Sequence, residues 1–97
     1  MSARTKPRVA LQEAILSLKT AAEVDRFLAD LCTPAEIEAI THRWWVAQLL
    51  DEKKLPYREI YKVTGASVAT ITRVARFLSQ ERYHGYRLVL DRCKASA

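Results

Sequence analysis

Few residues in this chain can break a helix or cross-link the fold. Only two glycines and three prolines occur among the 97 residues, which favours long helices over a sheet with many turns. Cys32 and Cys93 are too few and too far apart in the sequence for a disulfide framework or a zinc site. No apolar run approaches the roughly 20 residues that a membrane span needs. The first ten residues lack the apolar segment of a secretory signal, so we expect a reduced, cytoplasmic protein without a membrane partner.

What the chain does contain is apolar sequence in helical spacing. Hydrophobic residues make up 49% of it and charged residues 28%, which is typical of a globular protein. Apolar residues recur three and four positions apart, which predicts an all-α fold of about six helices. We expect the first helix at 9–19 and the second after a capping box of Thr20 and Glu23. Residues 1–8 then form a flexible basic arm, and residues 9–97 form a single helical domain.

The third expected helix is apolar around most of its circumference. A second capping box, Thr33 with Glu36, opens it, and it continues to about Lys53. A helix that is apolar on more than one face is buried on more than one side. Because a short chain can hardly cover such a helix, we expect an obligate homodimer with this helix at its centre. A monomer with one exposed aromatic patch is the alternative. The apolar residues are Ile37, Ile40, Trp44, Trp45, Val46, Ala47, Leu49 and Leu50.

The next two expected helices have the pattern of a helix-turn-helix. The first, at 57–63, follows Pro56 and carries Ile60 and Val63 inward. Gly65 can take the left-handed conformation of the turn, and Ser67 can cap a second helix that ends near residue 79. Tyr61 stands where many such motifs have alanine, so a purely structural helical hairpin stays an alternative. The residues expected to contact the other helix or the body of the domain are Ile60, Ile71 and Val74. We expect a turn at 83–85 and a last helix with Tyr86, Val89, Leu90 and Cys93.

Positive charge is concentrated in the second part of the chain. The net charge is +5, but residues 1–52 hold six Lys or Arg against eight Asp or Glu, whereas residues 53–97 hold ten against three. The positive field therefore lies with the expected helix-turn-helix and the segment after it. Cations that neutralise phosphates supply much of the affinity of DNA-binding proteins. A solvated basic face, common in proteins of similar isoelectric point, is the alternative.

The second helix of the pair carries small and hydroxylated side chains that suit a DNA groove. Thr70 and Thr72 can donate to base edges or phosphates, and Val68 and Ala69 can contact thymine methyl groups. We expect double-stranded DNA as the partner. The other candidate contacts are Arg58, Tyr61, Lys62, Ser67, Arg73 and Arg76, with Arg4, Lys6 and Arg8 in the arm.

Several segments, taken in order, match one known family. The most specific is GASVATITR at 65–73, and the others are TPAEIEA at 33–39, Arg43, LL at 49–50 and REI at 58–60. Over residues 31–76 the chain resembles the Trp repressor superfamily, and within it the YerC/YecD proteins, whose type of ending is similar to LVLDR at 88–92. The resemblance implies an intertwined all-helical dimer whose paired recognition helices enter successive major grooves. Symmetric half-sites would then lie roughly 34 Å apart.

The resemblance also implies roles for individual residues. Tryptophan repressors hold free L-tryptophan between two arginines and beside a threonine, and the matching residues are Arg43, Arg73 and Thr33. Where those repressors have a glycine and a small serine, this chain has Val74 and Phe77. These larger side chains would fill the ligand's space, so we expect no tryptophan ligand and no other cofactor. DNA binding would then be constitutive or answer another effector; a tryptophan-responsive repressor is the alternative.

Catalysis finds little support in the sequence. His42 and His84 are the only histidines, and neither lies beside a nucleophile or a cluster of metal ligands. No glycine-rich phosphate loop is present. The sequence therefore predicts a DNA-binding transcriptional regulator rather than an enzyme, with a helical protein-interaction module as the rival.

Overall fold

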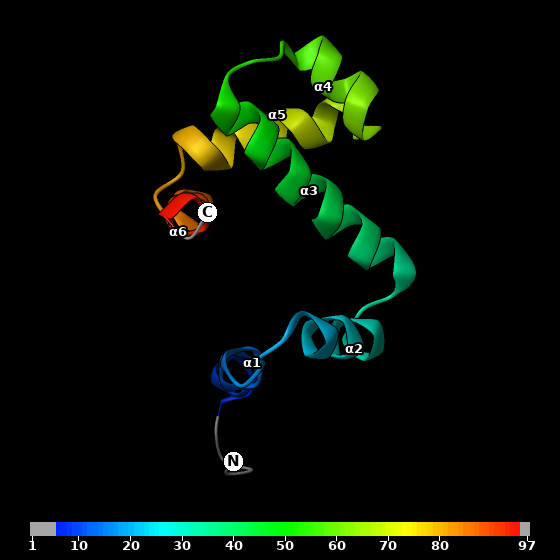
Figure 1. The fold of residues 1–97 in the computed structure, drawn as a ribbon, viewed down its shortest axis with the longest axis vertical. Helices are drawn as coiled ribbons and strands as arrows, with labels where there is room; N and C mark the ends of the chain where they lie inside the picture. The colour runs from blue at the N-terminus through cyan, green and yellow to red at the C-terminus, as the bar shows by residue number, and fades with distance from the viewer. Residues whose placement is uncertain (1–5, 96–97) are drawn as a thin grey trace. The chain divides into compact units, whose positions relative to one another are not determined.

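The computed structural model describes residues 6–95, which fold into six α-helices and contain no strand (Figure 1). The predicted all-α fold is confirmed. Met1–Thr5, which include most of the expected arm and its Arg4, lie outside the described residues. The chain divides into two compact units, 1–37 and 38–97, so the predicted single domain stays a prediction. None of the described helices is both long enough and apolar enough to cross a bilayer.

The first unit contains α1 (Pro7–Leu16) and α2 (Ala21–Leu31). Pro7 begins α1 because its missing N–H has no partner to lose at a helix start. The hydroxyl of Ser17 donates to the carbonyl of Ala14 at 2.6 Å and closes the last turn. The expected helix at 9–19 is therefore wrong at both ends. Pro7 and Arg8, the last two residues of the expected flexible arm at 1–8, belong to α1 instead.

Both predicted capping boxes are confirmed. The N–H of Glu23 donates to Thr20 Oγ1 at 3.1 Å, and the Glu23 carboxylate accepts the N–H of Lys19, one residue before the cap, at 2.8 Å. The second box is reciprocal: the N–H of Glu36 donates to Thr33 Oγ1 at 3.1 Å, and the N–H of Thr33 donates to Glu36 Oε1 at 2.8 Å. That backbone hydrogen bond to the carboxylate lowers the pKa of Glu36. Each box fixes a helix start from residues only three or four positions apart.

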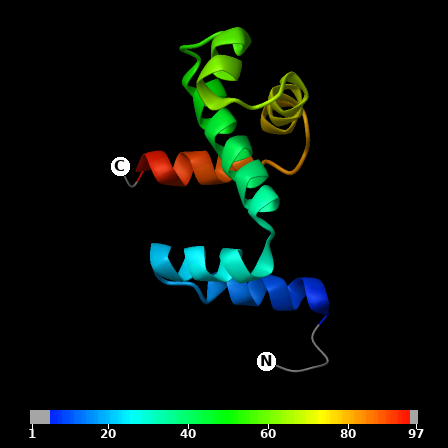
Figure 2. The ribbon, with the colours of Figure 1, turned by 90° about the vertical axis from the view of Figure 1, so that its right-hand side faces the viewer.

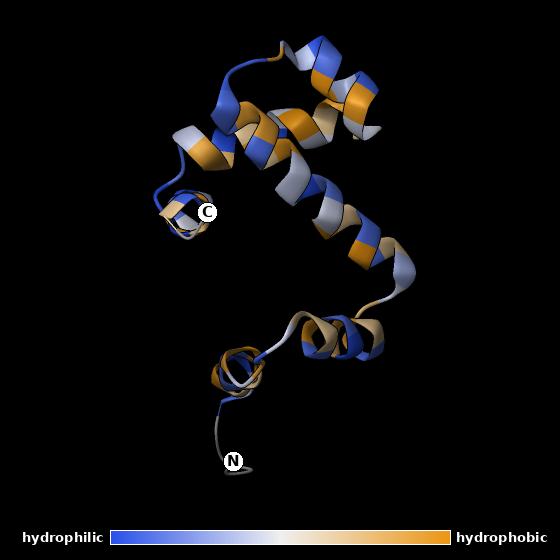
Figure 3. Ribbon diagram, in the orientation of Figure 1, coloured by the Kyte–Doolittle hydropathy of each residue, from blue (hydrophilic) through white to orange (hydrophobic). Residues whose placement is uncertain are grey.

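The second unit is built on α3 (Pro34–Glu52), most of which belongs to it, with α4 (Tyr57–Thr64), α5 (Val68–Ser79) and α6 (Gly85–Ala95). Hydrophobic residues lie on α3, α4 and α5 where these helices approach one another (Figure 3). This small core places α4 and α5 against the C-terminal part of α3. Its buried residues are Val46, Ala47, Ile60, Ala66, Ile71 and Val74.

Helix α3 is only partly covered within its own unit. Val46 and Ala47 are fully buried, but Ile40 and Trp45 remain about 40% exposed. On another side, Trp44 stacks on Tyr86 of α6 with ring centroids 6.4 Å apart, where α6 crosses α3 (Figure 2). The helix therefore has apolar residues on more than one face, as its sequence predicts.

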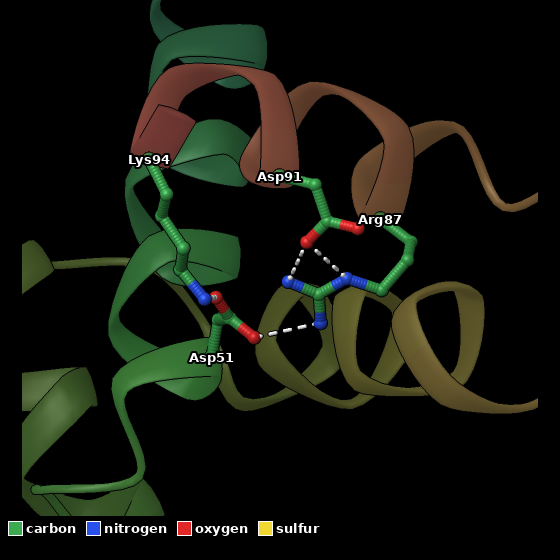
Figure 4. A network of polar contacts seen from close by, with 4 residues as sticks. All are labelled: Asp51, Arg87, Asp91 and Lys94. Atoms are coloured by element: carbon green, nitrogen blue, oxygen red, sulfur yellow. Dashed lines mark hydrogen bonds and ion pairs between the residues drawn. The ribbon is translucent and has the colours of Figure 1, made fainter. Parts of the chain in front are cut away.

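A polar network fastens α6 to the end of α3 (Figure 4). The side chain of Asp51 is only 9% exposed and forms ion pairs with Arg87 at 2.8 Å and with Lys94 at 2.6 Å. Arg87 also contacts Asp91, four residues on, at 2.9 Å. The hydrogen bonds from Arg87 and Lys94 lower the pKa of Asp51 from 3.8 to about 2. The carboxylate is therefore charged at every pH at which the protein would work.

Replacing Asp51 with asparagine should lower the free energy of unfolding at pH 7 by about 1–2 kcal/mol. Because Arg87 and Lys94 are 38% and 62% exposed, solvent screening keeps the effect below the full value of the pKa shift. The folded-state pKa lies below the unfolded one, so this stability is present above pH 4 and is lost as the pH falls towards 2. Urea unfolding of both proteins at pH 7 and near pH 2.5 tests this.

The control is Asp91→Asn, which removes a 61% exposed partner of the same arginine. It should change the free energy of unfolding by less than about 0.5 kcal/mol, because exposed ion pairs contribute little. Equal losses for the two variants, or a loss for Asp51→Asn that does not shrink in acid, would contradict the role given to Asp51.

Candidate nucleic-acid interface

Helices α4 and α5 pack together as the sequence predicts. Ile60, Ile71 and Val74 are at most 1% exposed, so the expected contacts with each other and with the body of the unit are confirmed. The inward position of Val63 is wrong, because its side chain is 49% exposed. Thr64 takes the inward place instead, since it lies four residues after Ile60 and shares its face of the helix.

The turn between the helices is held by local hydrogen bonds. Gly65 has φ 73°, in the left-handed region, and its N–H donates to the carbonyl of Tyr61 at 2.9 Å. No atom lies within 4 Å of a Cβ built at Gly65, so only the backbone conformation requires glycine there. The buried hydroxyl of Thr64 donates to the carbonyl of Ile60 at 2.8 Å and accepts the N–H of Ala66 at 3.0 Å. These contacts fix the direction in which α5 leaves the turn.

The start of α5 presents the predicted residues on its surface. Ser67 is the N-cap, and its Oγ accepts the N–H of Thr70 at 3.1 Å. The same hydroxyl donates to Thr70 Oγ1 at 3.0 Å, which leaves the proton of Thr70 free to donate outward. Val68 is 67% exposed, and Ala69 and Thr72 are exposed as well. Because α5 buries its opposite face, these side chains form the outer surface of a rigid helix.

The predicted cations of α4 and α5 are exposed but not all free. Lys62 lies 3.7 Å from Glu59, and Arg76 lies 3.9 Å from Glu81. Exposed ion pairs of this kind are weak, so a phosphate can displace either carboxylate. Arg58 and Arg73 are exposed too, and Tyr61 on α4 is 51% exposed. Lys6 and Arg8, the described cations of the expected arm, belong to the first unit.

Two residues of the candidate ligand pocket meet each other. Arg73 and Phe77 are four positions apart on α5, and the guanidinium carbon lies 4.2 Å from the ring centroid. Val74 is buried in the core, where a glycine would leave a cavity. Arg43 is half-buried on α3 and forms no ion pair with any residue in the range 6–95. Thr33 lies in the first unit, where its hydroxyl caps α3.

The sequence does not predict that Tyr57 and Tyr83 contribute to this surface. Tyr83, in the turn before α6, stacks on Phe77 with centroids 6.4 Å apart, and Arg76 lies over the same ring at 5.1 Å. Tyr57, the first residue of α4, lies beside Tyr61 and Val68. The two tyrosines are four positions apart on one helix, and this spacing could have predicted that they lie side by side. The contact of Tyr83 has no such signal, because it depends on the path of a turn.

The two histidines lie outside α4 and α5. His42 is half-buried on α3, and His84 is exposed in the turn before α6, with a φ of 55°. Neither lines the apolar groove between α4 and α5 that Tyr57, Tyr61 and Val68 border.

The fold and this surface define a helix-turn-helix protein. The sequence profile of the family described as Trp repressor protein matches residues 9–94, and the chain belongs to that family. The chain is 45% identical over 84 residues to the uncharacterized protein YerC of Bacillus subtilis strain 168. The aligned region covers 87% of this chain and 79% of YerC.

Two solved structures share the fold. A TrpR-like protein from Eubacterium eligens superposes with a TM-score of 0.86 at 41% identity, over 94% of this chain and 92% of that one. A candidate Trp repressor from Staphylococcus aureus gives 0.81 at 38% identity, over 88% and 83%. The predicted resemblance to Trp repressors and to the YerC type is thus confirmed.

Proposed function

We propose that this protein is a cytoplasmic, sequence-specific DNA-binding transcriptional regulator, most simply a repressor. The observation that carries the proposal is the exposed outer face of α5, with Val68, Ala69 and Thr72 on a helix whose other face is locked into the core. Its length and small side chains suit the major groove. The ten Lys or Arg of residues 53–97, against three Asp or Glu, supply attraction for phosphates.

The regulator acts as a homodimer. Support comes from apolar surface left open within each unit: none of the residues of α1 or α2 is buried, and Ile40 and Trp45 of α3 are about 40% exposed. A second copy would cover these side chains and repeat α5 at a fixed distance. Two such helices require symmetric half-sites about one helical turn, roughly 34 Å, apart.

The experiment is selection of bound sequences from a random pool of duplex DNA at physiological salt. We expect a palindrome whose half-sites are separated by about one turn of DNA, and sedimentation should give the mass of a dimer. Recovery of no common sequence, or a single unrepeated half-site from a monomeric protein, would reject the proposal.

Lys62 should add affinity without adding sequence preference. Replacing it with glutamine should weaken binding to all duplexes alike and reduce the slope of log K against log salt by about 1 per subunit, because one phosphate contact is lost. Thr70→Val should instead lower the preference for the selected sequence and leave that slope unchanged. Duplex affinities measured by fluorescence anisotropy between about 50 and about 300 mM salt separate the two effects. Lys19→Gln, in the first unit, is the charge-matched control.

A protein-interaction module is the second candidate, favoured by Leu88 and Val89 of α6, which are 50% and 44% exposed. The two functions differ in one measurement. A DNA-binding regulator shows a steep salt dependence of duplex affinity, whereas a module that binds only a partner helix shows none.

A further inference from the structure

An apolar groove of about 230 Å³ lies between α4 and α5. We call it the Tyr57–Tyr61 groove. Ile71 is 1% exposed and forms its floor, while Tyr57, Tyr61 and Val68 are 53%, 51% and 67% exposed and form its sides. Almost all of the lining is apolar, and Arg58 supplies the one charged group. The structure thus places an aromatic hollow next to the first turn of α5.

An apolar hollow is unusual on a surface that otherwise suits a polyanion. Ser67 and Thr70 lie beside it in the sequence at the cap of α5, Arg58 is part of its lining, and the charge of residues 53–97 is strongly positive. Exposed apolar patches mark binding sites, so the occupant must combine negative charge with an apolar group. Duplex DNA does so in its major groove, where thymine displays a C5-methyl group and the phosphates run alongside.

We propose that the Tyr57–Tyr61 groove reads thymine methyl groups, and so sets part of the sequence preference. This inference rests on the proposed function, because it needs α5 in the major groove. With a volume of about 230 Å³, the groove is large enough to take a thymine methyl group. Tyrosine suits the task because its ring is apolar while its hydroxyl can donate to a phosphate. The hydroxyl groups of Tyr57 and Tyr61 form no hydrogen bond to a residue within 6–95.

The test uses the full-length protein and the palindrome selected from random DNA. Each thymine is replaced in turn by deoxyuridine, which removes the methyl group and keeps the base pair. At the positions that face the groove, uracil should weaken binding about fourfold per methyl group. Thymines elsewhere should tolerate the change. Affinities come from fluorescence anisotropy at one fixed salt concentration.

A variant of the groove ties the effect to the protein. Tyr61→Ala should bind the thymine palindrome about fourfold or more weakly and should no longer distinguish thymine from uracil at those positions. Tyr83→Ala removes another exposed tyrosine, which does not line the groove, and should keep the full thymine-over-uracil ratio. The ratio is the readout, so a uniform change of affinity in either variant does not affect the test. Thermal melting by circular dichroism checks that both variants fold.

Three outcomes would overturn the inference. A selected palindrome whose uracil forms bind as tightly as its thymine form rejects methyl reading but leaves the proposed function intact. A Tyr61→Ala protein that keeps the thymine-over-uracil ratio also rejects methyl reading and leaves the proposed function intact. In either case, an apolar side chain of a protein partner becomes the alternative occupant of the groove. Recovery of no DNA sequence at all rejects both proposals together.

Discussion

Replacing Ile60 with alanine should lower the free energy of unfolding by about 2–5 kcal/mol. Ile60 is fully buried and joins α4 to the core formed with α3 and α5. Helix α4 has only eight residues, too few to be stable alone, so it depends on this contact. The variant should also bind DNA more weakly, because loss of α4 releases the turn that directs α5. Urea unfolding at pH 7 measures the first effect, and anisotropy with the selected palindrome measures the second.

Val63→Ala is the matched control, since it also shortens a β-branched side chain on α4. At 49% exposure it should change the free energy of unfolding by less than about 0.5 kcal/mol. A loss for Val63→Ala as large as that for Ile60→Ala would mean that Val63 is covered in solution, and would contradict the division of α4 into an inner and an outer face.

The contrast between these two residues shows what the sequence can and cannot predict about the fold. Both are apolar and lie on one short helix. A helical period of about 3.6 residues is compatible with spacings of three and of four, so over eight residues it cannot decide whether Val63 or Thr64 shares the inner face with Ile60. Capping is different, because its partners are three or four residues apart. The boxes at Thr20 and Thr33 and the cap at Ser67 were therefore predictable from the sequence.

Contacts between distant segments were not predictable. Asp51 and Arg87 are 36 positions apart, and only the fold brings them together. The same holds for Phe77 and Tyr83, whose stacking depends on the turn before α6. On the candidate DNA surface, periodicity and charge predict which side chains of α5 face outward. The apolar groove needs the angle between α4 and α5, which the sequence does not contain.

Phe77 should replace a ligand in holding the end of α5. Its ring lies under Arg73 and Arg76 and stacks on Tyr83. Phe77 therefore holds these three side chains in place. Cation–π and ring contacts of this kind contribute about 0.5–2 kcal/mol each. Phe77→Ser, which introduces the small residue that tryptophan repressors have at the matching position, should weaken DNA binding about tenfold, the equivalent of about 1.4 kcal/mol. Phe77→Tyr keeps the ring face and should bind as the original protein does.

We expect this because we propose that Phe77 and Val74 hold α5 in the position that a bound effector fixes in tryptophan repressors. L-tryptophan should therefore leave DNA affinity unchanged in the original protein and should not rescue Phe77→Ser, because Val74 still fills the core beside it. Calorimetry with L-tryptophan and a DNA shift assay with and without it measure this directly. Heat of binding at micromolar tryptophan, or DNA binding seen only in its presence, would establish the tryptophan-responsive alternative. A Phe77→Ser protein that binds DNA normally would show instead that the buried faces of α4 and α5 are sufficient to fix the recognition helix.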